Sequence, residues 1–221
     1  MIKLSKRLRK IAELVDKEDI VLDIGCDHAL LDIYLSNKYN KTYYASDLRE
    51  SALDMARANM KKYSCDKVVL KCGNGLDILE ENMNINTIVI SGMGYLSIMN
   101  ILKDIKYMKD INKLIIQSNS NSEIVRKFIL KNGFYIDKEC IVFEKNIYYI
   151  VSSFKRGKKK YSNIDKEIGI INDDELKDYL DIEIKKNNVL LSIVPKKEIL
   201  RRIYIKRKLS FLHKKKNSIF K

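Results

Sequence analysis

Two acidic residues stand beside apolar segments early in the chain, where carboxylates could hold a small ligand. Asp23 lies at the end of an apolar run that turns at Gly25, and Asp47 directly follows Tyr43–Ser46. A glycine lets the backbone approach a ligand closely because it carries no Cβ. An acid about 20 residues beyond such a turn is the usual ligand of ribose hydroxyls. We therefore predict a cofactor pocket at residues 23–28, with Asp47 at the ribose.

The glycine pattern of dinucleotide-binding proteins is absent from this turn. The pattern G-x-G-x-x-G would require glycines at the positions of Asp27 and Leu30. An acid at the turn would repel a pyrophosphate, but it would tolerate a cationic sulfonium. The residues therefore favour S-adenosylmethionine as the cofactor and disfavour a nicotinamide-dependent oxidoreductase.

Three further segments with glycine or amide side chains follow apolar runs: Gly73–Gly75, Ser91–Gly94 and Gln117–Asn119. Ligands bind at the carboxyl ends of parallel strands, so Asn74 could bind an adenine and Met93 could pack on a flat base. The amides of the third segment could read a base edge. Each segment also has a structural interpretation. The first could be an Asn-Gly turn, Met93 of the second could fill the core, and the third could cap the next helix.

Structural interpretations remain open for the first segment as well. Asp23 and Gly25 could form only a tight turn, and Asp47 could cap the following helix. His28 could shuttle a proton or could be a hydrogen-bonded structural group. The four cysteines lie far apart without a C-x-x-C pair, so we expect reduced thiols and no metal site.

An alternation of apolar strands and amphipathic helices must position these segments. We expect strands at 20–24, 42–46, 68–71, 87–90 and 113–116, and helices at 5–15, 27–37, 50–62, around 78, at 95–105 and from a capping box at Ser120–Glu123 to Lys131. Such alternation with short apolar strands predicts a parallel sheet that is covered on both faces.

The pattern changes after this alternation. Two β-rich runs at 134–143 and 147–154 predict an antiparallel hairpin. A basic linker follows, and then helices at 173–193 and 195–214, the second with Pro195 at its first position. We expect an α/β fold with a Rossmann-like class I methyltransferase sheet, whose parallel strands end in an antiparallel hairpin, plus a C-terminal α-helical hairpin. The expected domains are 1–156, which binds the cofactor and carries an N-terminal basic helix, and 157–221, which is basic and helical.

The net charge of +14 is concentrated near the end of the chain. Residues 195–221 contain eleven Lys or Arg and a single acid, Glu198. Clustering of this kind favours a polyanion such as nucleic acid, although a Lys-rich composition is an alternative explanation. No apolar run reaches the roughly 18 residues of a membrane span, and the basic N-terminus lacks a signal-peptide core. We expect a cytoplasmic protein without a membrane partner.

Several of these segments together resemble the bacterial tRNA (adenine-22-N1)-methyltransferases. The resemblance covers roughly residues 3–155 and rests on Lys3–Leu8, Asp23–Ala29, Gly73–Leu76, Ser91–Gly94 and Ile116–Asn119. It implies that S-adenosylmethionine is the cofactor, that tRNA is the partner, and that N1 of an adenine accepts the methyl group. It also implies a coiled-coil-like helical tail.

The resemblance implies roles for individual residues. The cofactor would contact Asp23, Gly25, Cys26, His28, Asp47, Leu48, Asn74, Gly75, Gly92 and Met93. Asp27, with His28 second, would stabilise the charge that develops on the adenine. RNA phosphates would contact Lys6, Arg7, Arg9, Lys10, Arg201, Arg202, Lys206, Lys214 and Lys215.

Three residues depart from the family pattern: Asn74 replaces Asp, Tyr95 replaces Gly and Ser118 replaces Pro. Asn74 can still bind an adenine, whereas Tyr95 narrows the expected base site. Two alternatives remain: a class I methyltransferase acting on another RNA or a small molecule, and a non-catalytic RNA-binding protein with the same fold. No obligate protein partner is evident.

Overall fold

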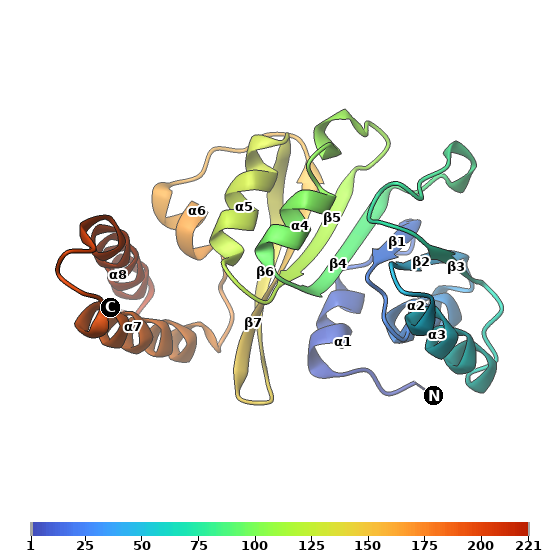
Figure 1. Ribbon diagram of the computed structural model, residues 1–221, viewed down its shortest axis with the longest axis horizontal. Helices are drawn as coiled ribbons and strands as arrows, with labels where there is room; N and C mark the ends of the chain where they lie inside the picture. Colours follow the sequence, from blue (N-terminus) through green and yellow to red (C-terminus); the bar gives the residue numbers. More distant parts are fainter. Residues whose placement is uncertain (1, 221) are drawn as a thin grey trace.

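A seven-stranded sheet forms the centre of the computed structural model, which describes residues 2–220 (Figure 1). The strand order is β3-β2-β1-β4-β5-β7-β6. The strands are β1 (Val21–Ile24), β2 (Tyr43–Asp47), β3 (Val68–Cys72), β4 (Thr87–Met93), β5 (Lys113–Ser118), β6 (Phe134–Glu144) and β7 (Ile147–Arg156). The pairs among β1–β5 are parallel, whereas β7 runs antiparallel to both β5 and β6. The expected sheet with its antiparallel hairpin is confirmed.

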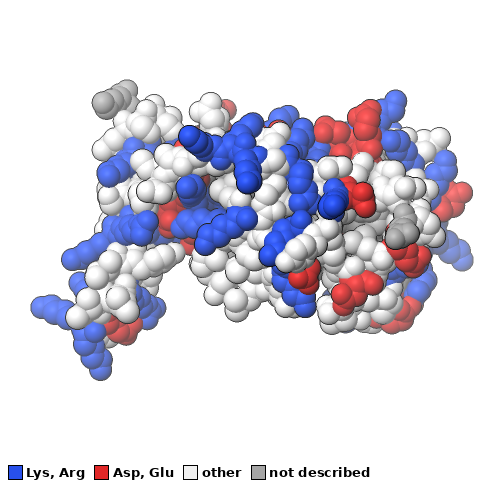
Figure 2. Space-filling model, turned by 90° about the horizontal axis from the view of Figure 1, so that it is seen from above, with Lys and Arg blue, Asp and Glu red and all other residues white. Residues whose placement is uncertain are grey.

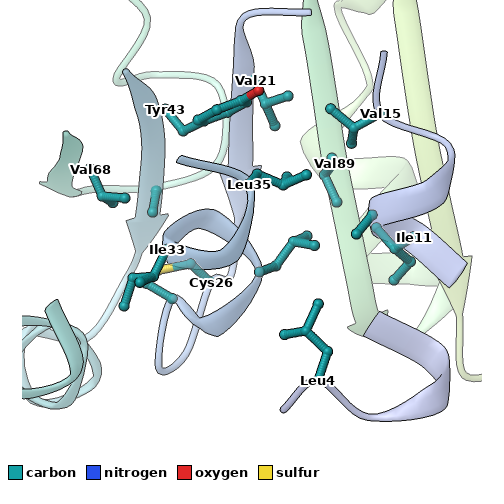
Figure 3. Close-up of a cluster of buried hydrophobic side chains, with 14 of the residues drawn as sticks. Leu4, Ile11, Val15, Val21, Cys26, Ile33, Leu35, Tyr43, Val68 and Val89 are labelled. Carbon is teal, nitrogen blue, oxygen red and sulfur yellow. The ribbon is translucent and has the colours of Figure 1, made fainter. Parts of the chain in front are cut away.

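Alternate residues of each strand point to opposite sides of the sheet. Helices cover the apolar side chains on both faces. The helices are α1 (Lys6–Glu13), α2 (Leu30–Tyr39), α3 (Glu50–Lys62), α4 (Tyr95–Ile101) and α5 (Ser122–Lys131), with 3₁₀ turns η1 (Glu81–Met83) and η2 (Ile105–Tyr107). Val21 and Val89 pack in one core with α1, α2 and α3 (Figure 3). Leu22 and Ile88 pack in the other core with α4 and α5.

The strand register brings the predicted loops to one edge of the sheet. Ile24 pairs with Ser46 on β2 and with Ile90 on β4. The β4–β5 pairing continues to Ser91 and Gln117, and then shifts register. The segments that follow β1, β2, β4 and β5 therefore leave the sheet at the same edge.

The helix expected from Asp27 begins instead at Leu30. Asp27 has φ +49° and Ala29 has φ +51°, so both lie in the left-handed region, which a right-handed helix excludes. Residues 25–29 therefore form a loop. The predicted start of this helix at residue 27 is therefore wrong by three residues.

Two other helix starts differ from the expectation. Asn121 precedes α5 in a left-handed conformation without a side-chain cap, so the predicted capping box is absent. The two residues expected to form the box have other hydrogen-bond partners. The Ser120 hydroxyl accepts from the Tyr95 amide at 3.4 Å, and Glu123 accepts from the Tyr204 hydroxyl at 3.0 Å. Pro195 lies in a turn rather than at a helix start.

The C-terminal region forms the expected helical hairpin of α7 (Leu176–Ile193) and α8 (Ile199–Ile219), preceded by a short helix α6 (Asn163–Ile168) that the sequence reading missed. Ile141 and Ile150 of the β6–β7 hairpin share a small core with Ile168, Leu176 and Leu212. The tail is thereby packed against the end of the sheet. Within residues 2–220, no helix has the length and apolar character needed to cross a bilayer.

A buried ion pair fastens the segment between the sheet and the tail. Arg126 Nε donates to Glu139 Oε1 at 2.8 Å, and both side chains are almost fully buried. Arg126 Nη1 also donates to the Glu167 carbonyl, and Glu139 Oε2 accepts from the Ile170 amide. One pair of charges therefore joins α5 and β6 to the chain that follows α6.

Replacement of Glu139 by Gln should lower the free energy of unfolding by about 3 kcal/mol, because it leaves a buried guanidinium without a counter-charge. Urea unfolding followed by circular dichroism measures the change. Glu13→Gln is the matched control, since the Lys10–Glu13 pair is exposed and its loss should cost at most about 1 kcal/mol. Equal losses in the two variants would contradict the role of the buried pair.

Candidate functional site

A cavity of about 420 Å³ lies at the carboxyl edge of the sheet, where the register brings the strand ends together. It is lined by Arg7, Leu8, Asp23, Gly25, Cys26, Asp27, His28, Leu30, Leu31, Asp47, Arg49, Ser91, Gly92 and Met93. The volume lies within the range of small-molecule sites. Eight residues predicted to serve the cofactor or the chemistry are thus brought to one cavity.

Gly25 fits the loop tightly against Met93 at the end of β4. Its φ is +77°, and a Cβ added there would lie 2.2 Å from the Met93 methyl carbon. The amides of Gly25 and Cys26 both donate to the Ser46 carbonyl, at 2.8 and 2.9 Å. A side chain at position 25 would therefore displace the floor of the cavity.

Two buried acids lie beneath the cavity. Asp23 is 4% exposed and Asp32, from α2, is 0% exposed. Asp23 Oδ1 and both carboxyl oxygens of Asp32 are buried without a hydrogen-bond partner among residues 2–220. Burial raises the pKa of Asp23 to about 7 and places the pKa of Asp32 well above its usual value. Because Asp23 lines the cavity, an ammonium group that enters it would meet a carboxyl group.

Asp47 forms the wall next to the end of β2. Its Oδ1 accepts from the Arg49 amide at 3.0 Å, and the Arg49 Nε lies 3.5 Å from the same oxygen. The carboxylate is held in place by its own loop. A fixed carboxylate with two oxygens suits a vicinal diol.

Asp27 and His28 lie at the mouth of the cavity. His28 Nε2 is 3.4 Å from Asp27 Oδ2, with side chains 45% and 60% exposed. Asn59 donates to the His28 carbonyl at 3.0 Å, which holds the loop on α3. Both side chains can reach a second molecule that enters from solvent. Neighbouring Cys26 is less suited to chemistry, because burial raises the pKa of its thiol and keeps it protonated.

Three of the predicted cofactor contacts do not line the cavity. Leu48 is 69% exposed, and Asn74 lies exposed in the loop after β3. Gly75 has φ +56° and packs against Ile101, so its role in this structure is a tight turn. The contacts of these residues with a cofactor stay predictions.

Several residues of this site were not predicted from the sequence. Arg7 was expected only at RNA, yet its side chain lines the cavity together with Arg49 and Ser91. Asp32 was not singled out at all. The detectable signal was an acid inside the apolar run Leu30–Leu35, where a charge is unusual.

The cations predicted to contact RNA have different surroundings. Arg202 donates to the Leu191 and Val194 carbonyls, and Lys215 donates to the Gly169 carbonyl at 3.1 Å, so both fasten the tail. Exposed cations include Lys6, Arg9, Arg201, Lys206 and Lys214. Figure 2 shows Lys and Arg predominating at the end that carries α7 and α8, whereas acids gather at the opposite end.

No group of three or more His, Cys, Asp or Glu side chains able to hold a metal ion occurs between residues 2 and 220. The polar groups of the cavity are carboxylates, an imidazole and two guanidinium groups. Their arrangement can bind an ammonium, a diol and an anionic group without a metal ligand set.

Comparisons with known proteins agree on one family. The family described as "Methyltransferase domain" matches residues 4–151. A Mycoplasma genitalium protein named "Putative tRNA methyltransferase" is 32% identical over 173 residues, which are 76% of this chain and 77% of that protein. The tRNA (adenine(22)-N(1))-methyltransferase of Bacillus subtilis is 27% identical over 175 residues, which are 77% of this chain and 73% of the relative.

The solved structure of M. capricolum TrmK in complex with S-adenosyl-homocysteine has a TM-score of 0.86 with this structure at 26% identity. The match covers 98% of this chain and 99% of that chain, including the helical tail. The chain belongs to the methyltransferase family, as a member of its tRNA (adenine-22-N1)-methyltransferase group.

Proposed function

We propose that this protein transfers the methyl group of S-adenosylmethionine to N1 of adenine 22 in tRNA. The observation that carries the proposal is the acid-walled cavity at the carboxyl edge of a class I methyltransferase sheet. The names of the B. subtilis and M. capricolum relatives supply the target nucleotide and the cofactor.

The residues of the cavity fit the cofactor. The Asp23 carboxylate, which lines the cavity, suits the ammonium group of the methionine part, and Asp47 suits the ribose diol. Gly25 and Gly92 leave backbone exposed at the cavity wall. When bound, S-adenosylmethionine supplies a methyl group on a sulfonium, and the acids of this chain favour that positive charge. Asn74, Gly75, Leu48 and Cys26 remain proposed contacts of the same ligand.

Asp27 and His28 are the proposed catalytic residues because they face solvent at the mouth of the cavity. The target adenine must leave its stack to reach this point. Its N1 lone pair forms the new bond to carbon while the bond from carbon to sulfur breaks, and the base is cationic until a proton leaves N6. The Asp27 carboxylate would stabilise that charge, and positioning provides much of the remaining acceleration.

Separate parts of the chain would serve the methyl donor and the RNA. We place the cofactor site in residues 1–156 and a helical RNA-binding domain in residues 157–221. Exposed cations of α1 and α8 would contact phosphates, whereas Arg202 and Lys215 would act mainly by holding the tail in shape. A tRNA substrate and four free cysteines support a cytoplasmic location.

The test is methylation of tRNA that lacks the modification. Incubation with S-adenosylmethionine, followed by mass spectrometry of the nucleosides, should detect 1-methyladenosine. A tRNA with guanine at position 22 should remain unmethylated. Binding of tRNA without methyl transfer would instead favour a non-catalytic RNA-binding protein, and methylation of the guanine-22 tRNA would indicate another target.

The affinity for S-adenosyl-homocysteine should fall about tenfold from pH 8 to pH 6. Burial raises the pKa of Asp23 to about 7 in the free protein, and the charge of Asp47 adds to this, whereas the neighbouring Asp32 carboxyl and the charge of Arg7 lower it. The ammonium group of the ligand favours the ionised carboxylate. Below pH 7 binding must therefore release a proton, which weakens it. Isothermal titration calorimetry measures the affinity.

Asp23→Asn should remove this dependence, because the amide side chain does not titrate between pH 6 and pH 8. His28→Gln is the control for the imidazole in the same cavity and should keep the dependence. An affinity that is constant between pH 6 and 8 in the unmodified protein would contradict the assignment to Asp23.

Asp27→Ala should lower kcat about 100-fold, because the variant lacks the carboxylate that stabilises the methylated base. The affinity for S-adenosyl-homocysteine should change less than about threefold, a small free-energy change. Asp66→Ala removes an exposed acid far from the cavity and should behave like the unmodified protein. Loss of ligand affinity with Asp27→Ala would make Asp27 a residue of the cofactor pocket instead.

A further inference from the structure

The peptide of Gly92 is held from both sides by side chains of β5 and the segment after it. The Gly92 amide donates to Gln117 Oε1 at 3.0 Å, and Asn119 Nδ2 donates to the Gly92 carbonyl at 2.7 Å. Gln117 Nε2 donates to Asn119 Oδ1 at 3.1 Å, which fixes the orientation of the Gln117 amide. These bonds replace the backbone pairing lost at the register shift between Ser91 and Met93.

Gln117 has a second partner at the same oxygen. Arg7 Nη1 also donates to Gln117 Oε1, and the Arg7 guanidinium lies 5.3 Å from the centre of the Tyr149 ring. The same nitrogen is 3.2 Å from the position that a Cβ on Gly92 would take. Gln117 is 0% exposed, so a buried neutral amide fixes a guanidinium at the wall of the cavity.

The charge of Arg7 is not neutralised by these contacts. Among residues 2–220, no carboxylate lies within ion-pair distance of Arg7, although its charge lowers the pKa of Asp23. A fixed cation opposes both a sulfonium donor and a cationic methylated base. Its presence in the cavity is therefore explained by an anionic group of a bound ligand.

We propose that Gln117 is a positioning residue, which holds Arg7 at the cavity wall as an uncompensated cation for an anionic group of the ligand. That group is the carboxylate of the methyl donor or the phosphate of the target nucleotide; the phosphate case rests on the proposed function. Guanidinium binds both anions through paired hydrogen bonds. A glutamate at position 117 would accept the same bonds but would neutralise Arg7.

The experiment therefore compares Gln117→Glu with the unmodified protein. If the anion is the donor carboxylate, the variant should bind S-adenosyl-homocysteine about tenfold more weakly, which corresponds to one charge-assisted contact. Its affinity for decarboxylated S-adenosylmethionine should then be unchanged. If the anion is the phosphate, both affinities should stay within about threefold, while KM for tRNA rises about tenfold and the salt slope of tRNA binding falls by about one.

The proposal would be overturned if Gln117→Glu showed neither of these two changes. It would also be overturned if the binding of all three ligands weakened equally, because that result would indicate a purely structural role. If the buried glutamate of Gln117→Glu prevents folding, as judged by circular dichroism, Arg7→Gln is the variant to be measured instead. It should give the same pattern, and adding Gln117→Glu to it should have little further effect. Lys109→Gln, which removes an exposed cation at the opposite edge of the sheet, is the matched charge control.

Absence of methyl transfer to tRNA by the unmodified protein would count against the proposed function alone. The comparison of S-adenosyl-homocysteine with decarboxylated S-adenosylmethionine requires no tRNA. That arm still tests whether Gln117 keeps Arg7 available for a carboxylate.

Discussion

Parallel pairing of β1 with β2 and β4 is the constraint on which the site depends. Because Ile24 is level with Ser46 and Ile90, the segments after these strands leave the sheet at one edge. The cavity is the space between those segments, closed by α1. A shift of one residue in this register would exchange core-facing and opposite-facing side chains and would separate Asp23 from Asp47.

The chemistry of the cavity follows from the charged side chains that have no partner of opposite charge there. A buried carboxylate such as Asp23 is unfavourable unless a partner arrives, so it selects a ligand with a positive charge. Arg7 lies in the same cavity without an ion-pair partner among the described residues, and it selects a negative group. A zwitterionic donor satisfies both requirements, whereas a pyrophosphate would satisfy only one.

Local sequence signals predicted the elements, and tertiary packing decided the details of the site. The helix at 50–62 is confirmed, because its formation depends on residues that are neighbours in the chain. The left-handed residues Asp27 and Ala29 were not predictable, since that conformation is unfavourable for them locally and is imposed by contacts. The same reason applies to Arg7, whose place in the cavity depends on how α1 packs on the sheet.

The basic tail shows why charge in a sequence overstates a binding surface. Arg202 and Lys215 use their charge on main-chain carbonyls at the end of α7 and after α6, and Lys216 pairs with Asp181. Such cations complete helix ends that would otherwise leave carbonyl groups unsatisfied. Exposed cations such as Lys206 stay available to an anionic partner, so the surface that could bind a polyanion is smaller than the net charge implies.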